Sequence, residues 1–151
     1  MNKEEITLAD IFAARNRLTS IINETPLISA LDLSTKVESN VYYKLETMQE
    51  TNSFKVRGAG NVILNLTPKQ KKRGVVTYST GNHGRATAHV AQLVGSQAKI
   101  CLSHNVPENK KEGIQKSGGE LVVYGDSQDE ATEKARKLVE EEGLALVDPI
   151  N

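Results

Sequence analysis

Cysteine and tryptophan are scarce in this chain of 151 residues, which has one cysteine and no tryptophan. The single cysteine, Cys101, excludes an internal disulfide and any zinc site built on several cysteines. It lies in the apolar stretch AKICLS, so we predict a buried, unreactive thiol in a strand. The three histidines are scattered and lack matching carboxylates, so no metal site is predicted.

The chain also has no net charge, because nineteen Lys and Arg residues balance nineteen Asp and Glu. It therefore creates no overall field that attracts nucleic acid or an anionic membrane. The one basic cluster, KQKKR over 69–73, is interpreted as a solvated helix end before Gly74. No apolar run approaches the about 20 residues of a membrane span, and the start MNKEEITLAD has no apolar signal core. These features predict a cytoplasmic protein without nucleic-acid or membrane partners.

The first part of the chain is predicted to hold two helices and two extended segments. Thr7 and Asp10 form a capping-box-like start for a helix over 8–22. Pro26 enforces an extended entry into TPLISA, and NVYYKLE is typical of a strand. The stretch FKVRGAGNVILNL, residues 54–66, is predicted to be the second helix.

From Gly74 onward, short apolar strands alternate with helices that end at glycines. Strands are expected over 74–80, 98–103, 120–125 and 144–150, and helices over 83–95, 107–118 and 127–143. This alternation predicts the α/β class, with a parallel sheet covered by helices.

A lysine in the stretch TNSFKVRGAG is the first candidate site residue. Lys55 directly follows Phe54 and precedes Arg57 and a Gly-Ala-Gly run. Lysine amines are almost wholly protonated at neutral pH, so a nucleophilic lysine needs burial or a neighbouring cation. Phe54 is a candidate apolar wall, and Arg57 is a candidate for either the activating cation or the anchor of the loop. Ser53 is expected to shape the same pocket.

The second candidate is the loop STGNHGRA, which leaves a predicted strand and enters a helix. Ligands of open α/β sheets bind at the carboxyl ends of the strands, where this loop is expected. Its glycines allow close backbone approach, the helix start presents free N–H groups, and Asn82 adds an amide. These features predict that the loop binds a small anion. Two alternatives remain: the loop binds a nucleotide phosphate, or it is an ordinary glycine turn capped by Asn82.

Together, SFKVRGA and STGNHG resemble the pyridoxal-phosphate enzymes of the threonine dehydratase and serine racemase family, which have fold type II. The likeness covers the whole chain and includes TPL, YYKLETMQETNSFKVRGA, VPENKKEGIQKSGGELVVYG and LVDPIN. STGNHGRA together with SQDEA is most similar to the hydroxyectoine-utilisation dehydratase branch. The resemblance implies that this chain is the N-terminal portion of the fold type II architecture.

The resemblance also implies the roles of individual residues. Pyridoxal 5'-phosphate is expected to form a Schiff base with Lys55, which then serves as the base for the substrate α-proton. Phe54 and Asn82 are implied cofactor contacts, with the Asn82 amide at the ring oxygen. The implied contacts of the substrate carboxylate, largely through backbone N–H groups, are Ser79, Thr80, Gly81, Asn82 and His83. The implied reaction is β-elimination from a serine- or threonine-like amino acid, which yields a 2-oxo acid and ammonia.

One departure from the family pattern favours elimination over racemisation. Racemases of the family are similar in having a serine just before the loop glycine, where this chain has Thr80. The β-branch of threonine stiffens the side chain and crowds the cofactor ring.

Family members are considerably longer than this chain. The resemblance implies that residues 1–67 belong to the large domain, 68–147 form a small α/β domain, and 148–151 begin the return to the large domain. A glycine-rich phosphate loop and a polar partner for the pyridine nitrogen are expected beyond Asn151. Besides the amino-acid substrate, the implied partner is a second copy or a complementary C-terminal half. Two alternatives stay open: a noncatalytic remnant or split subunit, and an anion-binding α/β module in which Lys55 is incidental.

Overall fold

The structure, a computed structural model, describes residues 5–79 and 81–149. Residues 1–4, Thr80 and residues 150–151 lie outside the described residues, and with them the last residues of the predicted strands 74–80 and 144–150. The described part holds a two-stranded antiparallel sheet and a four-stranded parallel sheet. The predicted α/β class, with a parallel sheet covered by helices, is confirmed.

The parallel sheet has the strand order β5-β4-β3-β6. Its strands are β3 (Val75–Tyr78), β4 (Ala98–Leu102), β5 (Glu120–Val123) and β6 (Ala145–Leu146). Val75 at the start of β3 pairs with Ala98 on one side and Ala145 on the other. Because β3 lies inside the sheet, the loop that leaves its carboxyl end opens between two neighbouring strands.

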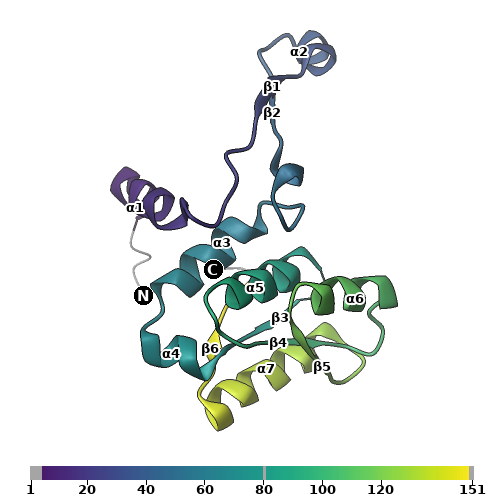
Figure 1. Cartoon of the computed structure of the whole chain (residues 1–151). Helices are drawn as coiled ribbons and strands as arrows, with labels where there is room; N and C mark the ends of the chain where they lie inside the picture. Colours follow the sequence, from purple (N-terminus) through teal and green to yellow (C-terminus); the bar gives the residue numbers. More distant parts are fainter. Residues whose placement is uncertain (1–4, 80, 150–151) are drawn as a thin grey trace.

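Helices cover both faces of this sheet (Figure 1). One face packs against α5 (Asn82–Leu93) and α6 (Glu108–Lys116), with α3 (Lys55–Asn65) packed on α5, and the other face packs against α7 (Gln128–Glu142). The alternation of strand side chains explains the division, since Ile100 and Leu102 face the first group and Cys101 faces α7. Cys101 is fully buried, which confirms the predicted position in the core, and burial raises the pKa of its thiol to about 11.

The N-terminal part forms a helix and an arm. Its elements are α1 (Leu8–Leu18), β1 (Leu27–Ser29), α2 (Leu31–Val37), β2 (Tyr42–Lys44) and a 3-10 turn, η1 (Glu46–Met48). Figure 1 shows the β1–β2 pair, with α2 at its tip, extending away from the parallel sheet. We call the segment from β1 to β2 the arm. The sequence pattern did not predict α2.

The predicted capping box of α1 is confirmed, but the helix is shorter than expected. Thr7 and Asp10 exchange side-chain and backbone hydrogen bonds at the helix start. The helix ends at Leu18, four residues before the predicted end, and the Thr19 hydroxyl donates back to the carbonyl of Arg15 at 3.1 Å. Hydroxyl and β-branched residues are weak helix formers, and here they end the helix before the chain turns toward α3.

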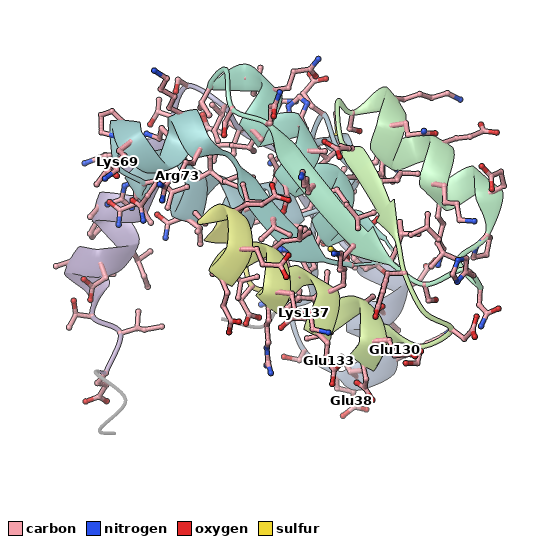
Figure 2. All side chains as sticks on the ribbon, turned by 90° about the horizontal axis from the view of Figure 1, so that it is seen from below. Glu38, Lys69, Arg73, Glu130, Glu133 and Lys137 are labelled. Carbon is pink, nitrogen blue, oxygen red and sulfur yellow. The ribbon has the colours of Figure 1, made fainter. Side chains whose placement is uncertain are left out.

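The basic cluster is the solvated helix end that the sequence predicts. Helix α4 (Pro68–Arg73) begins with a capping box between Thr67 and Gln70 and ends at Gly74. Lys69 and Arg73 are exposed on it (Figure 2). Cations in the last turn stabilise a helix through its dipole, so the cluster has a local structural explanation.

Large apolar side chains are exposed mainly before residue 50. They include Ile6, Leu8, Ile11 and Phe12 around α1, and Leu27, Ile28, Leu31, Leu33, Val37, Tyr42, Tyr43 and Met48 in and beside the arm. Exposed apolar side chains concentrated in one part of a chain are a common feature of interaction surfaces. Among the described residues, no helix is both long and apolar enough to cross a bilayer.

Gly60 is the position at which α1 approaches α3. A Cβ added to Gly60 would lie 2.5 Å from Ile21 Cδ1 and 2.8 Å from Leu18 Cδ2, whereas one added to Gly58 meets no atom within 4 Å. We expect Gly58→Ala to stabilise the protein by about 0.5–1 kcal/mol through helix propensity. Gly60→Ala must displace both side chains and is expected to be less stable than Gly58→Ala by about 1–3 kcal/mol. Urea unfolding followed by circular dichroism measures the difference; equal midpoints would contradict the packing.

Candidate functional site

Lys55 is the first residue of α3, and its amine lies beside the chain that follows β6. The Nζ atom donates to the backbone carbonyl of Pro149 at 3.1 Å and lies 5.5 Å from the centroid of the Phe54 ring. Lys55 is half-buried, but the Phe54 ring is 59% exposed. Phe54 therefore borders the amine without enclosing it.

The predicted binding loop joins β3 to α5. Gly81 is the N-cap of α5 without a side-chain capping bond, and Asn82 and His83 are the first two helical residues. The backbone N–H of Ser79 donates to the carbonyl of Cys101 at 3.3 Å, which holds the loop on β4. A Cβ added to Gly81 would meet no atom within 4 Å, so there is open space in front of this backbone. Free N–H groups at a helix start suit an anion in that space. Thr80, predicted with these residues, lies outside the described residues.

Residues Val147–Pro149, here called the return segment, bring Lys55 and this loop together. The carbonyl of Val147 accepts a bond of 2.6 Å from the Thr77 hydroxyl and lies 3.1 Å from Nε2 of His83. Two residues later, the carbonyl of Pro149 accepts the bond from Lys55. The starts of α3 and α5 thus meet at the carboxyl end of β3.

His83 is buried at this meeting point. Burial lowers the pKa of its imidazole and the Lys55 cation lowers it further, whereas the Val147 carbonyl and Asp148 act in the opposite direction. The ring is therefore neutral at neutral pH. A neutral imidazole has one N–H, and a carbonyl accepts only, so Nε2 is the donor to Val147.

Tyr78 adds a further contact to the return segment. Its hydroxyl donates to Oδ2 of Asp148 at 3.2 Å. Burial raises the pKa of the Tyr78 phenol, and the Asp148 charge raises it further, so the phenol remains a donor at neutral pH. The end of β3 therefore contacts the return segment through both Thr77 and Tyr78.

A partly buried polar network lies at the base of the arm and anchors the first turn of α3, which begins with Lys55. Arg57 donates from Nε and Nη2 to the two oxygens of Glu46, each at 2.7 Å, and the Thr25 hydroxyl donates to Glu46 Oε1 at 2.7 Å. Gln49 donates to Glu46 at 3.3 Å and to the carbonyl of Asn23 at 3.0 Å. Of the two roles considered for Arg57, the structure shows the anchor. No sequence pattern identified Glu46, because its partners come from distant segments.

Ser53 has an unsatisfied hydroxyl two residues before Lys55. Its side-chain oxygen is buried and has no hydrogen-bond partner within the described part of the chain. Leaving a buried polar atom unpaired costs about 1–3 kcal/mol. Ser53 thus carries an unsatisfied polar atom close in sequence to the half-buried Lys55.

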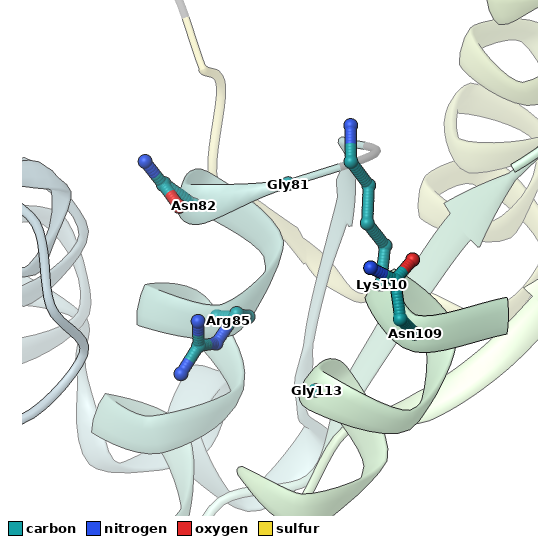
Figure 3. A pocket seen from close by; sticks show the side chains of 6 residues that line it. All are labelled: Gly81, Asn82, Arg85, Asn109, Lys110 and Gly113. Carbon is teal, nitrogen blue, oxygen red and sulfur yellow. The ribbon is translucent and has the colours of Figure 1, made fainter. Parts of the chain in front are cut away.

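The far side of the loop borders a hollow between α5 and α6. Its volume is about 320 Å³, and its lining residues are Gly81, Asn82, Arg85, Asn109, Lys110 and Gly113. Figure 3 shows Arg85 on α5 opposite Gly113 of α6, with Lys110 extending from the same helix. The loop is thus open on this side.

These features define a small-ligand site at the carboxyl edge of an open parallel sheet, built around a lysine amine and the start of a helix. A family model described as pyridoxal-phosphate dependent enzyme matches residues 18–151. The chain belongs to this family of pyridoxal-phosphate-dependent enzymes.

Curated relatives include both dehydratases and racemases. A protein of Sinorhizobium fredii (strain NBRC 101917 / NGR234), provisionally named threonine dehydratase, is 44% identical over 146 residues, which are 97% of this chain and 44% of the relative. The catabolic L-threonine dehydratase of Staphylococcus aureus (strain USA300) is 36% identical over 145 residues, 95% of this chain and 42% of the relative. This chain therefore spans less than half the length of the curated relatives it matches.

Solved structures confirm the fold of the N-terminal portion. Maize serine racemase superposes with a TM-score of 0.88 at 34% identity, over 93% of this chain and 43% of that chain. The processed form of threonine deaminase isoform 2 from Solanum lycopersicum gives a TM-score of 0.82 at 33% identity, over 93% and 40%. The predicted resemblance and the fold type II architecture are thus confirmed.

The described residues fit one end of pyridoxal phosphate. The Lys55 amine suits the aldehyde, and the exposed Asn82 amide can bond a polar group of the ring. The uncapped start of α5 suits a carboxylate beside it. The site is therefore compatible with the cofactor of the family.

The Glu46–Arg57 pair generates a pH-dependent prediction. The bonds from Arg57 lower the pKa of Glu46 from 4.5 to about 2. A carboxyl group whose pKa is lower in the folded state than in the unfolded state stabilises the fold at pH values above the unfolded pKa. This stabilisation is lost as the pH falls from about 4.5 to about 2. We expect Glu46→Gln to cost about 2 kcal/mol at pH 7, after allowance for solvent screening.

Urea unfolding of the unsubstituted chain and of Glu46→Gln measures this cost. The experiment is repeated between pH 2.5 and 7 in steps of about 0.5 pH units. The difference in unfolding free energy should shrink below about pH 4.5. Glu50→Gln, which removes an exposed carboxylate nearby, is the matched control. A Glu46→Gln effect that is constant across the range would show that the ion pair is not its origin.

Proposed function

We propose that this chain is the N-terminal part of a pyridoxal-phosphate-dependent lyase that eliminates the β-hydroxyl group of a serine- or threonine-like amino acid. The products are a 2-oxo acid and ammonia. The observation that carries the proposal is the meeting of the Lys55 amine and the start of α5 at the return segment. An enzyme that uses this cofactor on an amino acid needs a lysine amine for the cofactor and, close to it, an anion site for the substrate carboxylate.

Lys55 is proposed to hold the cofactor and to move the substrate α-proton. When bound, pyridoxal phosphate supplies the electron sink that makes this proton removable. The Lys55 amine donates to the carbonyl of Pro149, and it can exchange this bond for a bond to a ligand. A base must lie within hydrogen-bond reach of the proton it takes, and the first turn of α3 provides that position.

The loop 79–83 is proposed to bind the substrate carboxylate. The N–H groups at the start of α5 and the positive end of its dipole face the open space at Gly81. Asn82 is proposed to donate to the ring oxygen of the cofactor. The preference for elimination over racemisation rests on Thr80, and relatives with both kinds of name leave it as a proposal.

The domain division 1–67, 68–147 and 148–151 is likewise a proposal. It is supported by the parallel sheet and its helices α5–α7 in the second range, and by the exposed apolar residues of the first. Helix α3 packs against α5, so the first two ranges share a core.

We infer that the apolar face of α1 and the arm is covered by the part of the family architecture that this chain does not span, in the same or a complementary polypeptide. That part is also proposed to bind the cofactor phosphate and the pyridine nitrogen.

Covalent trapping tests the role of Lys55. The purified chain is incubated with stoichiometric pyridoxal phosphate, reduced with borohydride, digested and analysed by mass spectrometry. We expect predominant labelling of Lys55 over the exposed Lys69, because Lys55 follows Phe54 and bonds the return segment, whereas Lys69 is an exposed residue of α4. Lys55→Ala should lose this label and keep its fold. Labelling scattered over surface lysines would show that the described residues do not select the cofactor.

Complementation tests the reaction and the need for the missing portion. The chain is mixed with pyridoxal phosphate and the C-terminal part of the Sinorhizobium fredii relative, which begins where the match to this chain ends. With L-serine or L-threonine, we expect equal amounts of 2-oxo acid and ammonia, and none with Lys55→Ala. Formation of the D-amino acid instead would contradict elimination. Cofactor trapping without turnover would favour a noncatalytic remnant.

A further inference from the structure

We propose that the His83 side chain is a positioning residue for Lys55. By donating to the carbonyl of Val147, His83 holds the return segment where the carbonyl of Pro149 receives the Lys55 amine. The inference rests on the proposed function of Lys55, and it assigns to the imidazole a task separate from the backbone contacts of the loop.

The carbonyl of Val147 has two side-chain partners from different layers. Thr77 reaches it from β3 at 2.6 Å, and His83 reaches it from the first turn of α5 at 3.1 Å. A carbonyl oxygen has two lone pairs, so these two donors use its full capacity. The N–H of the same residue donates to the carbonyl of Val76 at 2.9 Å, so the peptide groups on both sides of Val147 are held.

The chemistry of histidine suits this position. The imidazole is 6% exposed, and the charged groups that act on it are Lys55 and Asp148. A neutral ring donates one hydrogen bond without adding a positive charge beside the Lys55 amine, which lysine or arginine would add. The ring therefore orients the segment and leaves the charge balance around the amine unchanged.

The consequence appears when Lys55 exchanges its bond to Pro149 for a bond to a ligand. The return segment then loses one of its contacts to α3. Thr77 and His83 keep Val147 in place, so the distance from Lys55 to the start of α5 is preserved. Without His83, the segment and the amine are expected to move apart.

Two substitutions separate the hydrogen bond from the volume of the ring. In His83→Gln, the side-chain amide nitrogen occupies the place of Nε2 and can donate to Val147. In His83→Asn, the amide corresponds to Nδ1 and falls short of this carbonyl. Thr77→Val, which removes the other donor and keeps the shape of the side chain, provides a second test at the same oxygen.

The first measurement uses acetic anhydride without cofactor and compares acetylation of Lys55 with that of Lys69 in the same molecule. We expect His83→Asn and Thr77→Val to raise the Lys55-to-Lys69 ratio by about fivefold, the change expected for one ordinary hydrogen bond. His83→Gln should stay within about twofold of the unsubstituted chain. Circular dichroism and urea midpoints identify folded variants.

The second measurement is pyridoxal-phosphate trapping on the same proteins. If His83→Asn only loosens the structure in general, Lys55 becomes more accessible to both acetic anhydride and pyridoxal phosphate. If His83→Asn removes the positioning of Lys55, acetylation of Lys55 rises and its selective trapping by pyridoxal phosphate falls. Unchanged ratios in His83→Asn and Thr77→Val, or a failure of His83→Gln to rescue, would overturn the role of His83. If the unsubstituted chain shows no selective trapping, the described residues do not select the cofactor, and the acetylation ratios still decide whether His83 positions Lys55.

Discussion

The carbonyl oxygen of Val147 is the point on which the site depends. It accepts from Thr77 in the sheet and from His83 in α5, and the next carbonyl but one accepts from Lys55 at the start of α3. Three elements separated in the chain are thereby held at the carboxyl end of β3. Because this edge of an open sheet is where ligands bind, a short stretch of backbone decides how the lysine lies relative to the anion site.

The base of the arm constrains Lys55 from the other side. The Glu46–Arg57 pair joins η1 to the first turn of α3 with two hydrogen bonds of 2.7 Å. The Thr25 hydroxyl donates a further hydrogen bond to the same carboxylate. The arm itself exposes apolar side chains, whereas its base is polar and satisfied. This contrast fits a segment that is fixed to the α/β core at one end and offers its remaining surface to further polypeptide, consistent with a chain that spans less than half of its relatives.

Local sequence rules predicted most of the core elements. Thr7 and Asp10 marked the start of α1, Gly143 marked the end of α7, and the apolar strands indicated the parallel sheet. The helix end after Leu18 was not predicted, and neither was α2, a seven-residue helix with no buried residue and no side-chain cap. The Glu46–Arg57 network was invisible in the sequence, since only the folded chain brings Thr25, Glu46 and Arg57 together. The placement in a particular dehydratase branch stays a prediction.

The family and the candidate site residues were predicted from the sequence alone. An amine after an apolar residue and a glycine loop before a helix are local features, and local features need no fold to be recognised. Tertiary structure decided the partners of these residues. Lys55 bonds a carbonyl 94 positions away and His83 one 64 positions away, and such pairs form only after the parallel sheet has set the end of β6 beside β3. The reason is physical: hydrogen bonds have strict distance and angle requirements, and only the packed sheet and helices satisfy them across such separations.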